Sequence, residues 1–184
     1  MATSTSTPDA APAGPEPRHR TLETINEQIA AIDELVGLAT QSIRVFDVDL
    51  SETGWNGVVR NEKLAAFLRG SRQARLEIIV HDTRWLESAG ARLMALLKMF
   101  SFGITVYKTG AEAKGAMDPL VIVDGRHFLH RFHIEQPRAA LGIEQPQDAQ
   151  PLVNRFAQAG RLEHAQLPQN LLGPQQREPP SPER

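Results

Sequence analysis

The 184-residue sequence contains no cysteine, which excludes disulfide bonds, thiolate nucleophiles and cysteine-ligated zinc. Charge of one sign is not in excess either, since the formal net charge is -2 at pH 7, and aromatic residues make up only 5% of the chain. Balanced charge gives no electrostatic reason to bind nucleic acid or a membrane surface, and few aromatic rings leave few platforms for stacking bases. We therefore expect no nucleic-acid partner, and the lack of cysteine favours a cytoplasmic location.

Long hydrophobic runs are also missing. The most apolar stretch, residues 93–104, is interrupted by Lys98 and falls far short of the roughly 20 apolar residues that span a bilayer. Residues 1–17 lack the basic start and apolar run of a secretory signal. We predict no membrane span, a disordered tail over residues 1–20, one domain over residues 21–165, and a second disordered tail over residues 166–184.

Helical and strand patterns alternate through the predicted domain. Apolar residues at three- and four-residue spacing, from Leu22 through Ile29 to Val36, predict an amphipathic helix over residues 21–40. Further helices are predicted from a cap at Asn61, over residues 84–100 and over residues 152–159, and strands over residues 42–50, 76–80 and 104–108. Residues 120–123 and 126–134 flank Asp124-Gly125, which is typical of a two-residue hairpin. This order predicts an α/β domain with a mixed, mostly parallel sheet flanked by helices and a terminal β-hairpin.

The order of these elements, together with the segment Val121-Ile122-Val123-Asp124-Gly125, resembles one half of a phospholipase D-like domain. The catalytic motif of that superfamily is His, one residue, Lys, four residues, Asp. Counting back from Asp124 places Met117 at the histidine position and Pro119 at the lysine position. The Gly-Ser and Asn that usually follow the motif are absent as well. The chain most resembles a set of bacterial phospholipase D-like domains of unknown function that lack the motif and carry segments like residues 124–132, and this resemblance implies a fold without an activity.

Two functional classes follow from this reading. The first is a non-catalytic module that binds a protein partner, a second copy of itself, or a phosphorylated or anionic ligand, without a cofactor. The second is a phosphodiesterase or phospholipase that recruits another histidine as nucleophile, such as His81 or His127. Two histidines facing one another across a crevice would favour the enzyme.

Asp124 has two interpretations. It is either a remnant of the catalytic motif or the first central residue of a type I′ turn, and the Asp-Gly pair favours the turn. His127, His130 and His133 follow it. Because side chains alternate along a strand, His130 points away from the other two, so we predict no metal site.

The same alternation places His127, Arg131 and His133 on one basic face of the strand and Phe128 and Phe132 on the opposite, apolar face. A forked contact from Arg131 is suited to a phosphate or carboxylate, so the basic face is a candidate anion site, although a solvated hairpin face explains it equally well.

Polar residues also follow the predicted parallel strands, where ligands tend to bind in open α/β sheets. Asp47, Asp49, His81 and Lys108 lie at three such ends and form a candidate crevice. Structural roles compete with this hypothesis, because Asp82 or Thr83 is suited to capping the next helix and Asp49 to starting a turn. We expect Trp55, in the loop after Asp49, to be a partly buried aromatic rather than a cover for the crevice.

Overall fold

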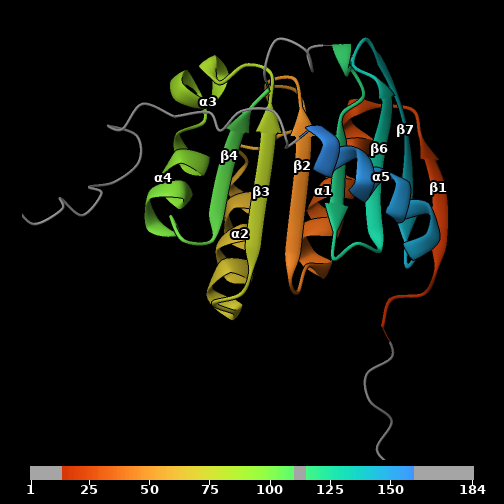
Figure 1. The fold of residues 1–184 in the computed structure, drawn as a ribbon, viewed down its shortest axis with the longest axis horizontal. Coiled ribbons are helices and arrows are strands. Elements are labelled where there is room, and N and C mark those ends of the chain that lie inside the picture. The colour runs from red at the N-terminus through yellow and green to blue at the C-terminus, as the bar shows by residue number, and fades with distance from the viewer. Residues whose placement is uncertain (1–13, 110–114, 160–184) are drawn as a thin grey trace, which may run out of the picture.

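The computed structural model describes residues 14–109 and 115–159, which form one α/β layered unit (Figure 1). A single sheet of seven strands has the order β1-β7-β6-β5-β2-β3-β4. The strands are β1 (Arg18–Leu22), β2 (Ser42–Asp47), β3 (Arg75–Val80), β4 (Ile104–Lys108), β5 (Leu120–Val123), β6 (His127–His133) and β7 (Gln136–Ile143). The α/β class, the mixed sheet and the β5–β6 hairpin are confirmed. The sheet is less parallel than predicted, because only β2/β3 and β3/β4 pair in parallel and the other four pairings are antiparallel.

Helices cover the two faces of the sheet unequally. The helices are α1 (Ile25–Leu38), α2 (Val58–Gly70), α3 (Arg84–Ser88), α4 (Ala91–Met99) and α5 (Pro146–Ala159). Figure 1 shows α1 and α2 behind the sheet and α5 in front of it, crossing β5 and β6. The larger hydrophobic cluster joins α1, α2 and α4 to the sheet, whereas the smaller one joins α5 to residues such as Phe46, Leu120 and Phe128. We call the face under α1 and α2 the inner face and the face under α5 the outer face.

The edge strand β1 and its neighbour β7 were not predicted. The sequence pattern places residues 18–20 in the tail and predicts Thr21 and Leu22 in the first helix. In the structure Thr24 and Glu27 form a reciprocal capping box, which starts α1 only at Ile25 and frees the preceding residues to pair with β7. An edge strand with one buried residue out of five has little hydrophobic alternation, and this explains why its sequence gave no strand signal.

Three helix boundaries also differ from the prediction. The helix expected over residues 84–100 is divided into α3 and α4 at Gly90, where an added Cβ would stand 2.7 Å from the Leu86 carbonyl oxygen. The second helix starts at Val58 after Gly57, not at Asn61. The last helix starts at Pro146 and continues through Pro151. No helix within residues 14–109 and 115–159 is long and apolar enough to cross a membrane.

Candidate functional site at the carboxyl edge of the parallel strands

The residue at the motif aspartate position is a structural clamp. Asp124 and Gly125 have φ angles of 51° and 66°, the pair of positive values that a type I′ turn requires. The Asp124 carboxylate accepts four hydrogen bonds: from the Thr40 amide (2.8 Å), the Thr40 hydroxyl (2.7 Å), the Gln41 amide (2.8 Å) and the Ser42 amide (2.8 Å). Burial opposes ionisation, but these donors outweigh it and lower the pKa of Asp124. The carboxylate therefore holds the start of β2 against the hairpin turn.

The segment at the other two motif positions extends the sheet. The Met117 carbonyl accepts a hydrogen bond from the Ile134 amide (2.7 Å), and the Pro119 carbonyl accepts one from the Arg131 amide (2.8 Å). Between them lies Asp118, whose side chain is only 12% exposed.

The Asp118 carboxylate holds two basic side chains. His130 Nε2 lies 3.1 Å from its Oδ2 atom, and Arg155 Nη2 donates to its Oδ1 atom. We call these three side chains the Asp118 cluster. His130 comes from β6 and Arg155 from α5, so the cluster ties the outer-face helix to the strand beneath it.

Arg131 is buried and fully engaged by protein acceptors. Its Nε donates to the Gln136 carbonyl (2.7 Å), its Nη2 to the Ile134 carbonyl, and its Nη1 to the Glu52 carboxylate (2.6 Å). An external anion could reach this guanidinium only by displacing Glu52, whose side chain is 51% exposed. The proposed anion position is thus occupied by a carboxylate of the same chain.

The predicted alternation along β6 is present, but the solvation of its faces is not as predicted. His127, Leu129 and Arg131 are all buried, and they lie on the inner face beneath α1. The physical reason is that β7 and β1 continue the sheet beyond β6, which makes β6 an interior strand. On the opposite face Phe128 is buried, whereas Phe132 is 50% exposed.

The three residues of the predicted basic face, His127, Arg131 and His133, do not share a site. His127 Nδ1 accepts a hydrogen bond from the Glu144 amide (2.9 Å), and burial lowers the pKa of His127. His133 is exposed, and its Nδ1 accepts a hydrogen bond from the Glu135 amide (3.2 Å). They lie at opposite ends of a seven-residue strand, with Arg131 turned inward between them.

The residues predicted to form a crevice have separate local roles. Asp47 is buried, and its carboxylate accepts hydrogen bonds from the Val48 amide (2.6 Å) and the Thr53 hydroxyl (3.4 Å). Burial raises the pKa of Asp47 to about 6. Asp49 accepts a hydrogen bond from the Ser51 amide (2.9 Å), as expected for a residue that starts a turn, and Lys108 is exposed at the end of β4.

His81 lies directly after the carboxyl end of β3. Its Nδ1 is 2.6 Å from the Thr109 hydroxyl, its Nε2 is 2.7 Å from the Ala116 carbonyl oxygen, and its ring meets Phe46 edge-on at 5.3 Å between centroids. His127 lies near the amino ends of the parallel strands, on the side of the sheet opposite to their carboxyl ends. It pairs with Val123, which in turn pairs with Ile43 near the amino end of β2. The two histidines considered as nucleophiles therefore do not face one another.

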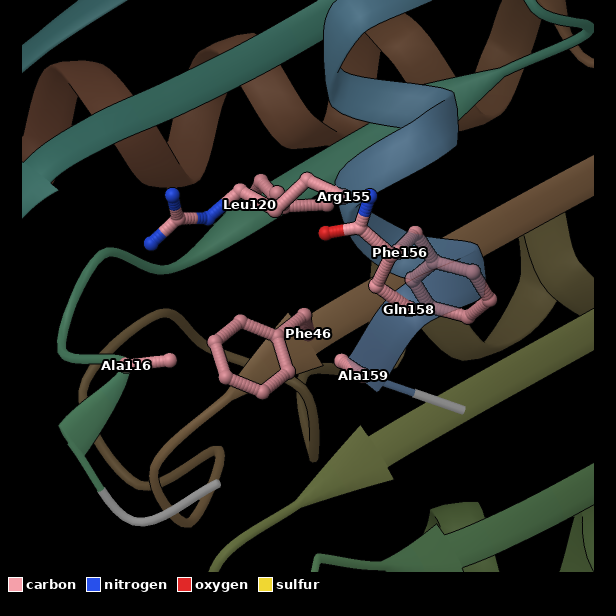
Figure 2. A pocket seen from close by; sticks show the side chains of 7 residues that line it. All are labelled: Phe46, Ala116, Leu120, Arg155, Phe156, Gln158 and Ala159. Atoms are coloured by element: carbon pink, nitrogen blue, oxygen red, sulfur yellow. The ribbon is translucent and has the colours of Figure 1, made fainter. Parts of the chain in front are cut away.

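A cavity of about 230 Å³ opens beside His81, at the same edge of the sheet (Figure 2). Its walls come from the end of β2, the start of β5, the segment before β5, and the last turns of α5: Phe46, Ala116, Leu120, Arg155, Phe156, Gln158 and Ala159. This edge was predicted from the sequence, because ligands in open α/β sheets tend to bind beyond the carboxyl ends of the strands. His81 contacts two residues of the cavity wall, Ala116 and Phe46. Sequence reasoning missed Arg155, because the predicted short helix carried no indication of the face on which it packs.

Two further predictions concern residues near this edge. Trp55 is a loop aromatic and not a cover for the crevice, but it is fully and not partly buried, with the Arg60 guanidinium 5.0 Å from its ring centroid. The N-cap residue of α3 is Thr83, whose side chain makes no capping hydrogen bond. Asp82, one residue earlier, accepts a hydrogen bond from the Arg84 amide (2.9 Å) and so satisfies one donor of the first turn. Within the described part of the chain, His, Asp and Glu side chains form no group of three or more suited to a metal ion.

The family comparison covers most of the chain. Residues 24–165 match the model of the domain of unknown function DUF7931. The chain belongs to this family. No curated protein matches the DUF7931 chain.

The fold of the DUF7931 chain resembles solved structures, one of which is a phospholipase D family member. Nuc from Salmonella typhimurium, a phospholipase D family member, aligns with a TM-score of 0.56 at 15% identity, over 80% of this chain and 96% of Nuc. TrmBL2, an archaeal chromatin protein that binds DNA, aligns with a TM-score of 0.58 at 11% identity, over 80% of this chain and 54% of TrmBL2. The chain thus spans about half the length of TrmBL2. At such identities the likeness establishes the fold alone, and the phospholipase D-like fold is confirmed.

Proposed function

We propose that this DUF7931 protein is a non-catalytic phospholipase D-like module that binds a small anionic ligand at the carboxyl edge of its parallel strands. The observation that carries the proposal is the replacement of the catalytic machinery. Met117 and Pro119 stand where the superfamily motif needs histidine and lysine, and the Asp124 carboxylate is committed to residues 40–42. Without a nucleophile or a cation at these positions, the motif has no means to form a covalent intermediate or to stabilise the transferred phosphate.

The cavity beside His81 supports binding as the remaining role. It combines apolar walls with a few polar groups, the composition usual for small-molecule sites. Arg155 at its rim carries a guanidinium, whose planar donors suit carboxylate and phosphate acceptors. The lack of cysteine agrees with a cytoplasmic setting, which is part of the proposal.

A hydrolase using His81 or His127 is the weaker candidate. Both ring nitrogens of each histidine already face protein atoms, at 2.6 and 2.7 Å for His81 and at 2.9 and 3.4 Å for His127. DNA binding, the property of TrmBL2, receives no electrostatic support from a net charge of -2.

Two measurements test the proposal. Phosphatidylcholine and a generic phosphodiester should be hydrolysed only at the background rate, and turnover that disappears in His81→Ala or His127→Ala would show an enzyme. In parallel, thermal unfolding is recorded with inorganic phosphate, a phosphomonoester, carboxylates and duplex DNA, because a ligand that binds the folded state raises its melting temperature. A shift with at least one small anion supports the module. No shift with any of them overturns the binding role.

A further inference from the structure

We infer that the cavity beside His81 takes a small monocarboxylate with a ring-sized apolar body, whose head group is held by Arg155 and whose body packs on Phe46, Leu120 and Phe156. This inference rests on the proposed binding function and adds the chemical class of the ligand. Three features of the cavity carry it: the free donors of the guanidinium, the fixed position of that guanidinium, and the size and polarity of the space.

The guanidinium of Arg155 has donors to spare. Its side chain is 49% exposed, and in the part of the chain that the structure describes, Asp118 is its one acceptor, contacted through Nη2. One of the two N–H groups of Nη2 is therefore used, and its second N–H remains, together with Nε and Nη1. Paired with the neighbouring nitrogen on its side, this second N–H of Nη2 completes one fork that matches the two oxygens of a carboxylate. Figure 2 shows Arg155 extending from α5 alongside Leu120, at the rim of the cavity.

Asp118 acts as a positioning residue for this head-group site. It lies between Met117 and Pro119, in the segment that extends the sheet ahead of β5, and His130 Nε2 holds its second oxygen at 3.1 Å. A carboxylate fixed from two sides holds the guanidinium in one place, which reduces the entropy that a ligand loses on binding.

Asp118 also selects the charge of the ligand. Its negative charge lies next to the head-group position and offsets part of the attraction that Arg155 exerts on an anion. For a dianion such as a phosphomonoester, that attraction and that repulsion both double, whereas the cost of removing the ion from water rises with the square of its charge. A single guanidinium already paired with a carboxylate therefore compensates a monocarboxylate better than a dianion. The cluster thus favours a monoanion.

The remaining walls define an apolar body of limited size. A space of about 230 Å³ holds roughly eight water-sized groups, enough for one aromatic ring or a short alkyl chain. Phe46, Leu120 and Phe156 are each at least nine-tenths buried, and they present carbon atoms to this space. In Figure 2 the ring of Phe46 lies between Ala116 and Ala159, whose small side chains leave the volume open.

The test is a titration of the full chain with benzoate, followed by calorimetry or by chemical-shift changes. Benzamide serves as the neutral isostere, and inorganic phosphate and phenyl phosphate serve as the other anions. We expect benzoate to bind at least tenfold more tightly than benzamide or phenyl phosphate. Arg155→Gln and Arg155→Lys should each weaken benzoate at least tenfold, the lysine because an ammonium loses the two-pronged contact.

Two further variants separate the site from general effects. Arg126→Gln is the matched control, because Arg126 is 55% exposed and also pairs with a carboxylate, that of Glu144, and it should leave benzoate affinity unchanged. Ala159→Leu keeps Arg155 but fills the cavity, so it should abolish binding without lowering the melting temperature. This variant keeps the test valid even if the arginine substitutions disturb α5.

The outcomes distinguish this inference from the function on which it rests. Absence of benzoate binding at millimolar concentration, or equal affinity in the parent, Arg155→Gln and Ala159→Leu chains, overturns the inference. If phosphate or phenyl phosphate binds and benzoate does not, the inference fails while the anion-binding module stands. If no anion binds, both fail.

Discussion

The carboxylate of Asp124 accepts two hydrogen bonds from Thr40, one from its backbone amide at 2.8 Å and one from its hydroxyl at 2.7 Å. The two residues are 84 positions apart, so the contact joins the hairpin turn to the entry of the central strand β2. The corresponding carboxylate of the phospholipase D superfamily belongs to the catalytic motif. In this chain, all observed contacts of the Asp124 carboxylate are with the scaffold. Its substitution should therefore be read as a change in stability.

Asp124→Asn should destabilise the fold by about 1–3 kcal/mol at pH 7, since hydrogen bonds to a charged group are lost while asparagine still accepts the turn conformation. The lowered pKa of Asp124 means that its contribution is present above the usual carboxyl value of 3.8 and is lost as the pH falls through the folded-state value. The difference between parent and variant should shrink below pH 3.8 in urea unfolding. Thr40→Val, which removes one donor only, should cost less. Equal stability of parent and Asp124→Asn at pH 7 would contradict the clamp.

Asp47→Asn should have the opposite dependence on pH. Burial raises the pKa of Asp47 from 3.8 to about 6, so the folded state binds a proton more tightly than the unfolded state does. The contribution of Asp47 to stability is therefore greatest below pH 3.8 and is lost as the pH rises through 6. Asparagine avoids this loss, and the variant should gain up to about 3 kcal/mol over the parent at pH 8 and little at pH 4, measured by urea unfolding. A difference that is the same at both pH values would show that Asp47 is not the group that titrates.

Phe128→Ala and Phe132→Ala form a matched pair on one face of β6. Phe128 is 4% exposed and lies opposite Gly142, where an added Cβ would come within 2.3 Å of its ring, so its removal should cost about 3–5 kcal/mol. Phe132 is 50% exposed, and its removal should cost less than about 1 kcal/mol. Thermal and urea unfolding of both variants measures the contrast. Similar losses of stability in the two variants would mean that more of the outer face is covered than α5 alone can cover.

Arg131→Lys should reduce stability despite keeping the charge. The three guanidinium nitrogens of Arg131 donate to three acceptors, the Gln136 carbonyl, the Ile134 carbonyl and the Glu52 carboxylate, and the single nitrogen of a lysine cannot reach all three. A buried acceptor left without a donor costs about 1–3 kcal/mol of stability. Glu52→Gln should cost less, because that side chain is half exposed and the two carbonyl contacts remain. If Arg131→Lys instead weakens the binding of an anion without a loss of stability, the guanidinium is a ligand site after all.

Local patterns in the sequence predicted the centre of the sheet well. The apolar runs gave β3 and β4 nearly to the residue, and Asp124-Gly125 located the hairpin turn. Strand β1 escaped prediction because four of its five residues are exposed, and β7 because its three exposed residues precede five buried ones, so neither strand shows the alternation typical of a half-buried strand. The candidate site was predicted only in part. The carboxyl-edge rule indicated His81, but the contact between Asp118 and Arg155 spans 37 residues and depends on how α5 packs, which no local spacing encodes.

The family match begins at residue 24, whereas β1 spans Arg18–Leu22. A chain begun at the family boundary would lack this strand, and the backbone amides and carbonyls of β7 that pair with it would become an open template for another chain. Such a protein should associate edge to edge in a concentration-dependent manner. The full chain ends its sheet instead in a strand bearing Arg18, His19 and Arg20, basic side chains of the kind that discourage such pairing. Five residues outside the family boundary thus determine which strand forms this edge of the sheet, and with it how readily the edge pairs with another chain.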